Sequence, residues 1–188
     1  MKICVFGASS DNIDASYFDA VEDLGRKLAK NSHTVVFGGG AHGLMGAVAR
    51  GAAEKNGKII GIAPSFFDVG DILYKDSGEL IFTETMAERK KMMEDISDAF
   101  IAVPGGVGTF EEFFEVLTLK QLQKHNKPLV IFNVNRYYDK LEELLEEIVK
   151  AGFMKRECKS VYKICNSAEE LIAYIEGYNE TLENVKKY

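Results

Sequence analysis

The sequence has 188 residues, 46% of them hydrophobic, which is enough for one globular domain with a sizeable core and too few for two comfortable domains. Its 29 acidic and 23 basic residues give a net charge of −6, which argues against nonspecific binding to nucleic acid or to an anionic membrane surface. The three cysteines form no metal-ligand spacing, and neither a leader peptide nor an apolar run of about 20 residues occurs. We therefore expect a cytoplasmic protein with no metal site.

The first third of the chain alternates between predicted strands and helices. Strands are expected over 2–6, 34–37 and 58–63, and helices over 15–30 and about 43–55. Glycine-rich turns follow the first two strands, at 7–12 and 38–46. A loop is expected over 65–78, with a brief strand over 80–83.

The second glycine turn contains a literal GxGxxG pattern, from Gly38 to Gly43. Ala63 and Pro64 stand where a dinucleotide site needs an acidic residue, so an NAD-dependent oxidoreductase is the weakest interpretation. Close approach of the backbone to another ligand explains the glycines better. His42 could contact that ligand, although a loop histidine without a partner is more often incidental.

A predicted helix over about 86–97 carries an arginine on its apolar face. The helix opens with the capping box Thr85-x-x-Glu88. Arg89 lies in the middle of an apolar arc formed by Met86, Met92, Met93 and Ile96. The stem of Arg89 either covers apolar surface or its guanidinium meets an anion, and the second is favoured because guanidinium groups are rarely buried without one.

The most informative stretch is the apolar strand at 99–103, followed by Pro104, a glycine turn and an aromatic-rich helix. Three glycines in four residues, Gly105, Gly106 and Gly108, allow a tight turn with exposed N–H groups. The following helix directs the positive end of its dipole toward the same turn. The order predicts a phosphate site, although no Gly-Lys-Ser/Thr of a Walker loop follows.

Glu112 has two interpretations. Thr109-x-x-Glu112 fits a capping box with Thr109 at the N-cap, which would make Glu112 structural. On a helical wheel, however, Glu111, Glu115 and Thr118 share a polar stripe, whereas Glu112 points into an apolar sector. Apolar residues cover most other directions, so we expect this helix to be buried on two sides, by its own sheet and by another surface such as a second subunit.

The rest of the chain continues the alternation. Strands are expected over 127–133 and 161–165, and helices over 137–150 and from a Ser167-x-x-Glu170 capping box to 176. The pattern predicts an α/β, Rossmann-like, doubly wound parallel sheet in a single domain, residues 1–178, with a C-terminal tail at 179–188. All three glycine turns then fall at the carboxyl edge of the sheet, where such folds bind ligands.

Three motifs carry a family resemblance. Residues 104–112 fit the pattern PGGxGTxxE, residues 86–90 fit Met-x-x-Arg-Lys, and residues 38–40 with 43–46 are similar to a third shared segment. The chain resembles the LOG (Lonely Guy) cytokinin-activating phosphoribohydrolases, a family long mislabelled as lysine decarboxylases. The resemblance implies a homodimeric enzyme with sites near the subunit interface. It also implies that the enzyme uses no cofactor and hydrolyses nucleoside 5'-monophosphates to free base and ribose 5-phosphate.

The residues and the resemblance together assign roles. Arg89 and Glu112 are the expected catalytic residues. The expected substrate-binding residues are Gly39, Met86, Lys90, Gly105, Gly106, Val107, Gly108, Thr109, Glu111 and Thr118. Asp71 occupies the place of a base-contacting glutamate, and Ala87 replaces a histidine common in the family, which leaves the base preference open. The alternative is a nonenzymatic nucleotide carrier, like the molybdenum-cofactor carriers of related fold.

Overall fold

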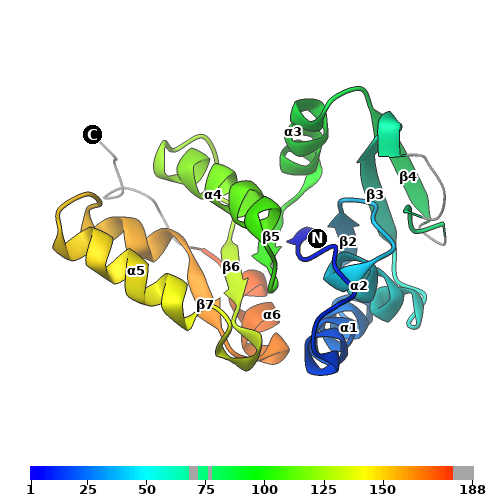
Figure 1. The fold of residues 1–188 in the computed structure, drawn as a ribbon, viewed down its shortest axis with the longest axis horizontal. Helices are drawn as coiled ribbons and strands as arrows, with labels where there is room; N and C mark the ends of the chain where they lie inside the picture. The colour runs from blue at the N-terminus through cyan, green and yellow to red at the C-terminus, as the bar shows by residue number, and fades with distance from the viewer. Residues whose placement is uncertain (68–71, 76–77, 180–188) are drawn as a thin grey trace.

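The computed structural model, which describes residues 1–67, 72–75 and 78–179, has a seven-stranded sheet in the order β4-β3-β2-β1-β5-β6-β7 (Figure 1). Every neighbouring pair of strands is parallel. The strands are β1 (Lys2–Phe6), β2 (Thr34–Phe37), β3 (Ile59–Pro64), β4 (Glu79–Thr83), β5 (Ala99–Ala102), β6 (Leu129–Phe132) and β7 (Lys163–Cys165).

Helices cover both faces of the sheet. They are α1 (Ala15–Lys30), α2 (Gly43–Ala53), α3 (Met86–Ile96), α4 (Val107–Gln121), α5 (Asp139–Lys150) and α6 (Ala168–Glu176), with short 3-10 helices at Ser65–Phe67, Val134–Arg136 and Arg156–Val161. Alternate residues of β1 enter opposite cores, Ile3 and Val5 with α1, α2 and α6, Cys4 and Phe6 with α3, α4 and α5. The predicted doubly wound α/β fold is confirmed.

The topology fixes where a ligand can bind. β1 lies between β2 and β5, and the chain winds outward from β1 to β4 and from β5 to β7, so the winding reverses between β1 and β5 (Figure 1). Ligands of open α/β sheets bind beyond the carboxyl ends of the strands at such a reversal. The turns after these two strands meet there, since the Ala8 backbone N–H donates to the Pro104 carbonyl over 3.1 Å.

The predicted N-cap of α4 is wrong. The helix begins at Val107 with Gly106 as its N-cap, so Thr109 lies inside the first turn and Glu112 is not part of a capping box. Glycine is accepted at an N-cap. Because the helix starts earlier, the buried Thr109 packs over Gly105, and a Cβ added to Gly105 would lie 2.1 Å from Thr109 Oγ1. The capping boxes at Thr85 and Ser167 are confirmed.

Described residues of the expected loop between β3 and β4 contact the glycine turn after β2. Leu73 forms an antiparallel bridge with Gly40, and the Ala41 N–H donates to the Ile72 carbonyl over 2.8 Å. The brief strand expected at 80–83 is the five-residue β4, paired with β3 at the sheet edge. Asp71 and residues 180–188 of the expected tail lie outside the described residues.

None of the helices in the described ranges combines the length and the hydropathy of a membrane-spanning segment.

Candidate active site

A pocket of about 580 Å³ lies at the carboxyl edge of the sheet, above the point where the winding reverses. The turns after β1, β2 and β5 form it together with α3, the start of α4 and the segment after β3. It is lined by Gly7, Ala8, Ser9, Gly38, Gly40, His42, Met45, Phe67, Ile72, Leu73, Met86, Arg89, Gly106, Val107, Gly108, Thr109, Glu111 and Glu112. The three predicted glycine turns therefore converge on one cavity.

A buried ion pair from two helices forms one wall of this pocket. Arg89 Nη1 of α3 donates to Glu112 Oε1 of α4 over 2.7 Å, and only 5% and 11% of the two side chains are exposed. Arg89 Nε donates to the Ile62 carbonyl at the end of β3 over 3.1 Å. The guanidinium is thus held by the sheet on one side and holds the carboxylate on the other.

The glycine at the end of β2 makes room for this pair. A Cβ on Gly38 would lie 1.9 Å from Arg89 Nη2, so no larger residue fits while the guanidinium keeps its place. The first glycine of the GxGxxG pattern therefore accommodates an arginine, which explains it without a dinucleotide.

Burial sets the protonation behaviour of the site. Removal from water raises the pKa of Glu112, and the attraction of Arg89 only partly opposes this. Below the pair, burial and the nearby Glu112 raise the pKa of the Cys4 thiol well above its usual range. Cys4 therefore stays protonated and is no nucleophile, whereas Glu112 is suited to exchange a proton nearer neutrality than an ordinary carboxyl group.

The N-terminus of α4 is open toward the pocket. Its N-cap, Gly106, supplies no side-chain acceptor, and Val107 is 84% exposed. The first N–H groups of a helix have no partner within the helix, so this end can bind an anion.

The N-terminus of α2 differs, although it also follows a glycine turn. The Gly43 N–H donates to Asp11 Oδ1 over 2.7 Å, and the Leu44 and Met45 N–H groups donate to the Ala8 carbonyl over 2.8 and 3.3 Å. These amide groups are already satisfied by the protein. A phosphate is therefore expected at α4 and not at α2.

Most of the predicted site residues line the pocket. These are the two expected catalytic residues, Arg89 and Glu112, together with Met86, Gly106, Val107, Gly108, Thr109 and Glu111. Arg89 is 4% exposed, so its prediction as a buried arginine facing an anion is confirmed.

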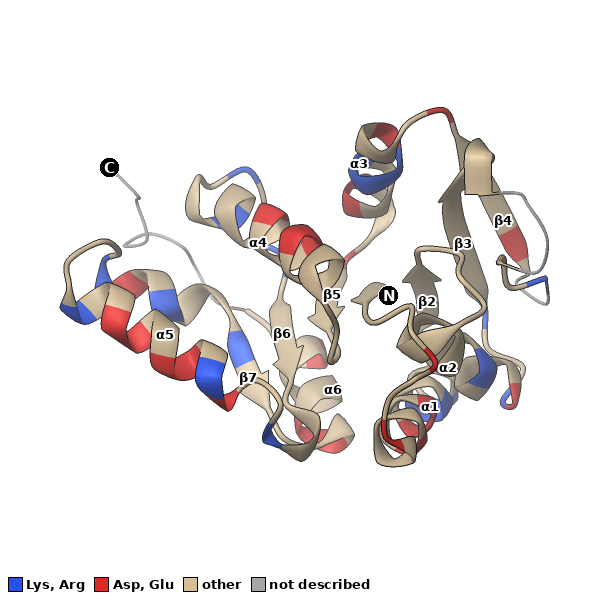
Figure 2. Ribbon diagram, in the orientation of Figure 1, with Lys and Arg blue, Asp and Glu red and all other residues tan. Residues whose placement is uncertain are grey.

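Four other predicted residues do not line it. Gly39 has a φ of +76° and accepts from the Tyr74 N–H through its carbonyl, and Gly105 lies beneath Thr109. Lys90 of α3 pairs with Glu111 and, over 2.8 Å, with Glu115 of α4. Both helices carry charged residues of both signs (Figure 2). Thr118 is half-buried further along α4.

Sequence reasoning missed several lining residues. Phe67, Ile72 and Leu73 form an apolar part of the wall, and the available signal was their hydrophobic character within an otherwise polar stretch. The expectation that His42 has no partner is wrong, because its Nδ1 lies 2.6 Å from Asp11 Oδ2. Because Asp11 and His42 lie 31 positions apart in two irregular segments, no sequence periodicity predicts their pairing.

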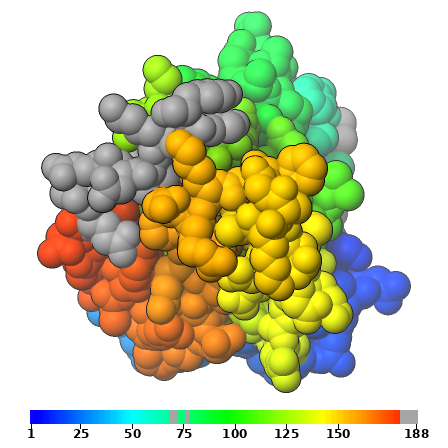
Figure 3. Space-filling model, turned by 90° about the vertical axis from the view of Figure 1, so that its left-hand side faces the viewer, coloured from blue at the N-terminus to red at the C-terminus, as the bar shows by residue number. Residues whose placement is uncertain are grey.

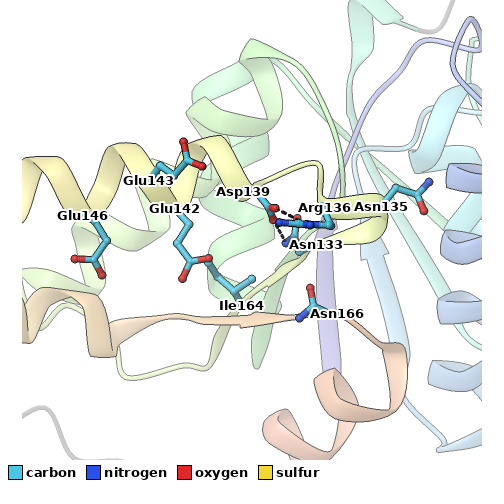
Figure 4. Close-up of a pocket in the computed structure, with 9 residues that line it drawn as sticks. All are labelled: Asn133, Asn135, Arg136, Asp139, Glu142, Glu143, Glu146, Ile164 and Asn166. Carbon is cyan, nitrogen blue, oxygen red and sulfur yellow. Dashed lines mark hydrogen bonds and ion pairs between the residues drawn. The ribbon is translucent and has the colours of Figure 1, made fainter.

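A second, more open cavity of about 810 Å³ lies between α5 and β7 (Figure 4). Its wall carries Glu142, Glu143 and Glu146 from α5, while Arg136 and Asn133 are bonded to Asp139. α5 and the segment that follows it, in yellow and orange, lie on the face of the molecule shown in Figure 3. This cavity contains none of the predicted site residues, and its acidic wall does not suit a phosphorylated ligand.

Comparison with known proteins places this site in a family. A family model described as "Possible lysine decarboxylase" matches residues 45–175. Cytokinin riboside 5'-monophosphate phosphoribohydrolase LOG4 of Arabidopsis thaliana is 37% identical over 184 residues, covering 98% of this chain and 86% of the relative. The chain belongs to the LOG family. The probable phosphoribohydrolase LOGL5 of Oryza sativa subsp. japonica is also 37% identical, over 94% of this chain and 72% of its own length.

Solved structures of lower identity share the fold with this LOG family member. The molybdenum cofactor binding protein of Rippkaea orientalis has a TM-score of 0.71 at 23% identity, covering 93% of this chain and 94% of its own. The Moco carrier protein of Chlamydomonas reinhardtii has a TM-score of 0.69 at 22% identity, with the same coverage of both chains. At these identities the likeness supports the Rossmann-like architecture alone.

Proposed function

We propose that this LOG family member hydrolyses the N-glycosidic bond of a nucleoside 5'-monophosphate, AMP or a cytokinin ribotide, to free base and ribose 5-phosphate. It would be an N-glycosyl hydrolase of the EC 3.2.2 type. The observation that carries the proposal is the buried Arg89–Glu112 pair beside the open N-terminus of α4 in a single pocket. A pocket that only bound a nucleotide would not need a buried carboxylate with a raised pKa.

The reaction follows from this arrangement. The N–H groups at the start of α4 bind the 5'-phosphate and thereby fix C1' of the ribose. The C1'–N bond breaks, the electron pair leaves with the base, and positive charge develops on the sugar. Ionised Glu112 stabilises that charge and accepts a proton from the attacking water, whose oxygen bonds to C1'. Glu112 then passes this proton to the nitrogen of the departing base, which leaves as the neutral free base, and Glu112 is again ionised.

Arg89 keeps Glu112 in place for this step. Its contacts with Ile62 and Glu112 hold the carboxylate on the pocket wall, and its charge favours the ionised form that acts as base. Lys90, engaged by Glu111 and Glu115, supports the outer face of α4.

The base has an apolar subsite available. Met86, Phe67, Ile72 and Leu73 line the pocket with flexible and aromatic side chains that suit the face of a purine. The names of the curated relatives, which specify cytokinin riboside 5'-monophosphate, support an adenine-type base.

We also propose a homodimer with the sites near its interface. Met86, which lines the pocket, is 40% exposed, Phe82 of β4 is 44% exposed, and Phe110 and Phe114 of α4 are only half-buried. Incompletely buried large apolar side chains on the elements around a site are typical of a subunit interface. The three cysteines are buried and form no disulfide, which suits a reducing compartment and supports a cytoplasmic location.

Product analysis separates this proposal from the carrier alternative. The purified protein is incubated separately with AMP, isopentenyladenosine 5'-monophosphate and NAD, and free base and ribose 5-phosphate are quantified by chromatography. We expect equal amounts of base and ribose 5-phosphate from the two monophosphates and unchanged NAD. Recovery of intact, tightly bound monophosphate would instead support a carrier.

A further inference from the structure

A histidine on the pocket wall pairs with a carboxylate, and neither residue belongs to the helices that carry the expected catalytic residues. His42, at the N-cap of α2, lines the pocket and places its Nδ1 2.6 Å from Asp11 Oδ2. Asp11 Oδ1 accepts from the Gly43 N–H over 2.7 Å, so the carboxylate holds the imidazole and the helix start together. With Nδ1 engaged, Nε2 is the nitrogen left for a ligand.

The other charged side chains of the pocket already have partners. Among the described residues that line it, the ionisable side chains are His42, Arg89, Glu111 and Glu112. Arg89 is paired with Glu112, and Glu111 is paired with Lys90. With its Nδ1 engaged by Asp11, the other ring nitrogen of His42 can add a hydrogen bond to a phosphate to those from the N–H groups of α4.

The backbone brings His42 toward the phosphate end of the pocket. Ala8 joins the two turns concerned, because its N–H donates to Pro104 before the α4 turn and its carbonyl accepts from Leu44 in the first turn of α2. A Cβ on Gly43 would lie 2.3 Å from the Ala8 carbonyl oxygen, and one on Gly105 would lie 3.0 Å from the Ala8 nitrogen. The His42 turn and the α4 turn thus pack against the same residue.

We propose that His42, positioned by Asp11, binds the 5'-phosphate of the nucleotide through Nε2 together with the N-terminus of α4. The inference rests on the proposed function for the identity of the substrate. His42 then binds the phosphate group, which a nucleoside lacks, and Asp11 holds the His42 side chain in position.

The neighbouring charges support this assignment. The backbone N–H of Gly43 and the bond to His42 lower the pKa of Asp11, so the carboxylate stays ionised beside the imidazole. Arg50 of α2 donates to the Ala41 carbonyl and pairs with Glu22 of α1 over 3.0 Å, so its charge is matched. Across the pocket lie Arg89, Glu111 and Glu112.

The test compares His42→Gln with the wild type in base release from AMP. Because the phosphate is bound equally in the ground and transition states, we expect KM to rise about tenfold or more while kcat changes by less than about twofold. Calorimetry should show the same loss of affinity for ribose 5-phosphate and no loss for adenosine.

Two further variants sharpen the test. Asp11→Asn keeps an acceptor for the Gly43 N–H and should also raise KM for AMP with little change in kcat, which tests the proposal if His42→Gln does not fold. His33→Gln is the matched control, because His33 also pairs with a carboxylate, Glu176 at 2.9 Å, but precedes β2 at the opposite edge of the sheet. It should leave KM unchanged.

The outcomes distinguish the two proposals. An unchanged KM in His42→Gln, or an equal loss of affinity for adenosine and AMP, would overturn the role of His42 even if AMP is hydrolysed. Weakened ribose 5-phosphate binding in a protein that never releases base would support His42 and contradict the proposed function.

Discussion

Arg89 can reach Glu112 because the turn after β2 carries no side chain at Gly38. The guanidinium occupies the volume that a Cβ would need, and its Nε donates a second hydrogen bond to the Ile62 carbonyl of β3. A side chain from α3 is therefore positioned by two strands. Small displacements of such a group are costly to catalysis because reacting groups must meet in one geometry.

Gly38→Ala is expected to lower kcat for base release by about 100-fold, since the new methyl group displaces the Arg89 guanidinium and with it Glu112. The free energy of unfolding should fall by no more than about 2 kcal/mol, because the displaced atoms end a flexible side chain. Steady-state kinetics and urea unfolding measure the two effects. Gly78→Ala, whose Cβ would meet only the Ile59 carbonyl at 3.7 Å, is the control, and equal kinetic losses in both variants would contradict this account.

The pH dependence of kcat should report Glu112. Burial raises its pKa above the ordinary value of 4.5, so its basic form is lost at a higher pH than for an exposed glutamate. We expect kcat to fall as the pH drops, with an acid midpoint above 4.5. A pH–rate profile with saturating AMP measures it, and a midpoint at or below that value would show that another group limits the reaction.

Both catalytic candidates were predictable from their helices, because a helical wheel places Arg89 and Glu112 in apolar sectors regardless of the rest of the fold. Their mutual contact was not predictable, since it depends on how α3 and α4 pack on the sheet. Thr109 was misassigned as a cap because its sequence pattern matches one, whereas packing over Gly105 draws it into the helix.

At the scale of elements, α2 and α4 show that a glycine turn before a helix does not by itself make an anion site. The amide groups of α2 are used by Asp11 and Ala8, whereas α4 begins at an exposed Val107 after a glycine cap. Only the second arrangement leaves donors for a ligand.

Val107→Asp should separate stability from affinity. A carboxylate in the first turn of α4 stabilises the helix by about 0.3–1 kcal/mol, yet it repels a phosphate at the same N–H groups. We expect a slightly higher midpoint of thermal unfolding together with a KM for AMP raised about tenfold or more. Val107→Asn supplies the uncharged control, and an unchanged KM in Val107→Asp would place the phosphate elsewhere.

Most elements followed from periodicity and turn residues, and β1, α1 and β2 have the predicted boundaries. β4 was the least apparent strand because it lies at the sheet edge, where most of its residues are partly exposed and it pairs with one strand, β3. The pairing of Leu73 with Gly40 joins residues without a shared pattern, so only the folded structure shows it.

At the scale of the whole molecule, the open question is what covers the apolar surface beside the pocket. If two chains associate there, static light scattering should give a mass of about 42 kDa, twice the 20.9 kDa of the chain, at micromolar concentrations. A mass of one chain that stays constant across a hundredfold concentration series would contradict the proposed homodimer.

The whole fold brings three strand ends and two helices to one cavity, where the proposed reaction needs the Glu112 carboxylate beside the sugar of the nucleotide. Glu112→Gln tests this most directly, because the amide keeps the size and the hydrogen-bond acceptor of the side chain but removes the base. We predict that AMP binding, measured by calorimetry, changes by less than about tenfold, while kcat for adenine release falls by about 100-fold to 10,000-fold. Adenine release at a near wild-type rate from Glu112→Gln would contradict the account.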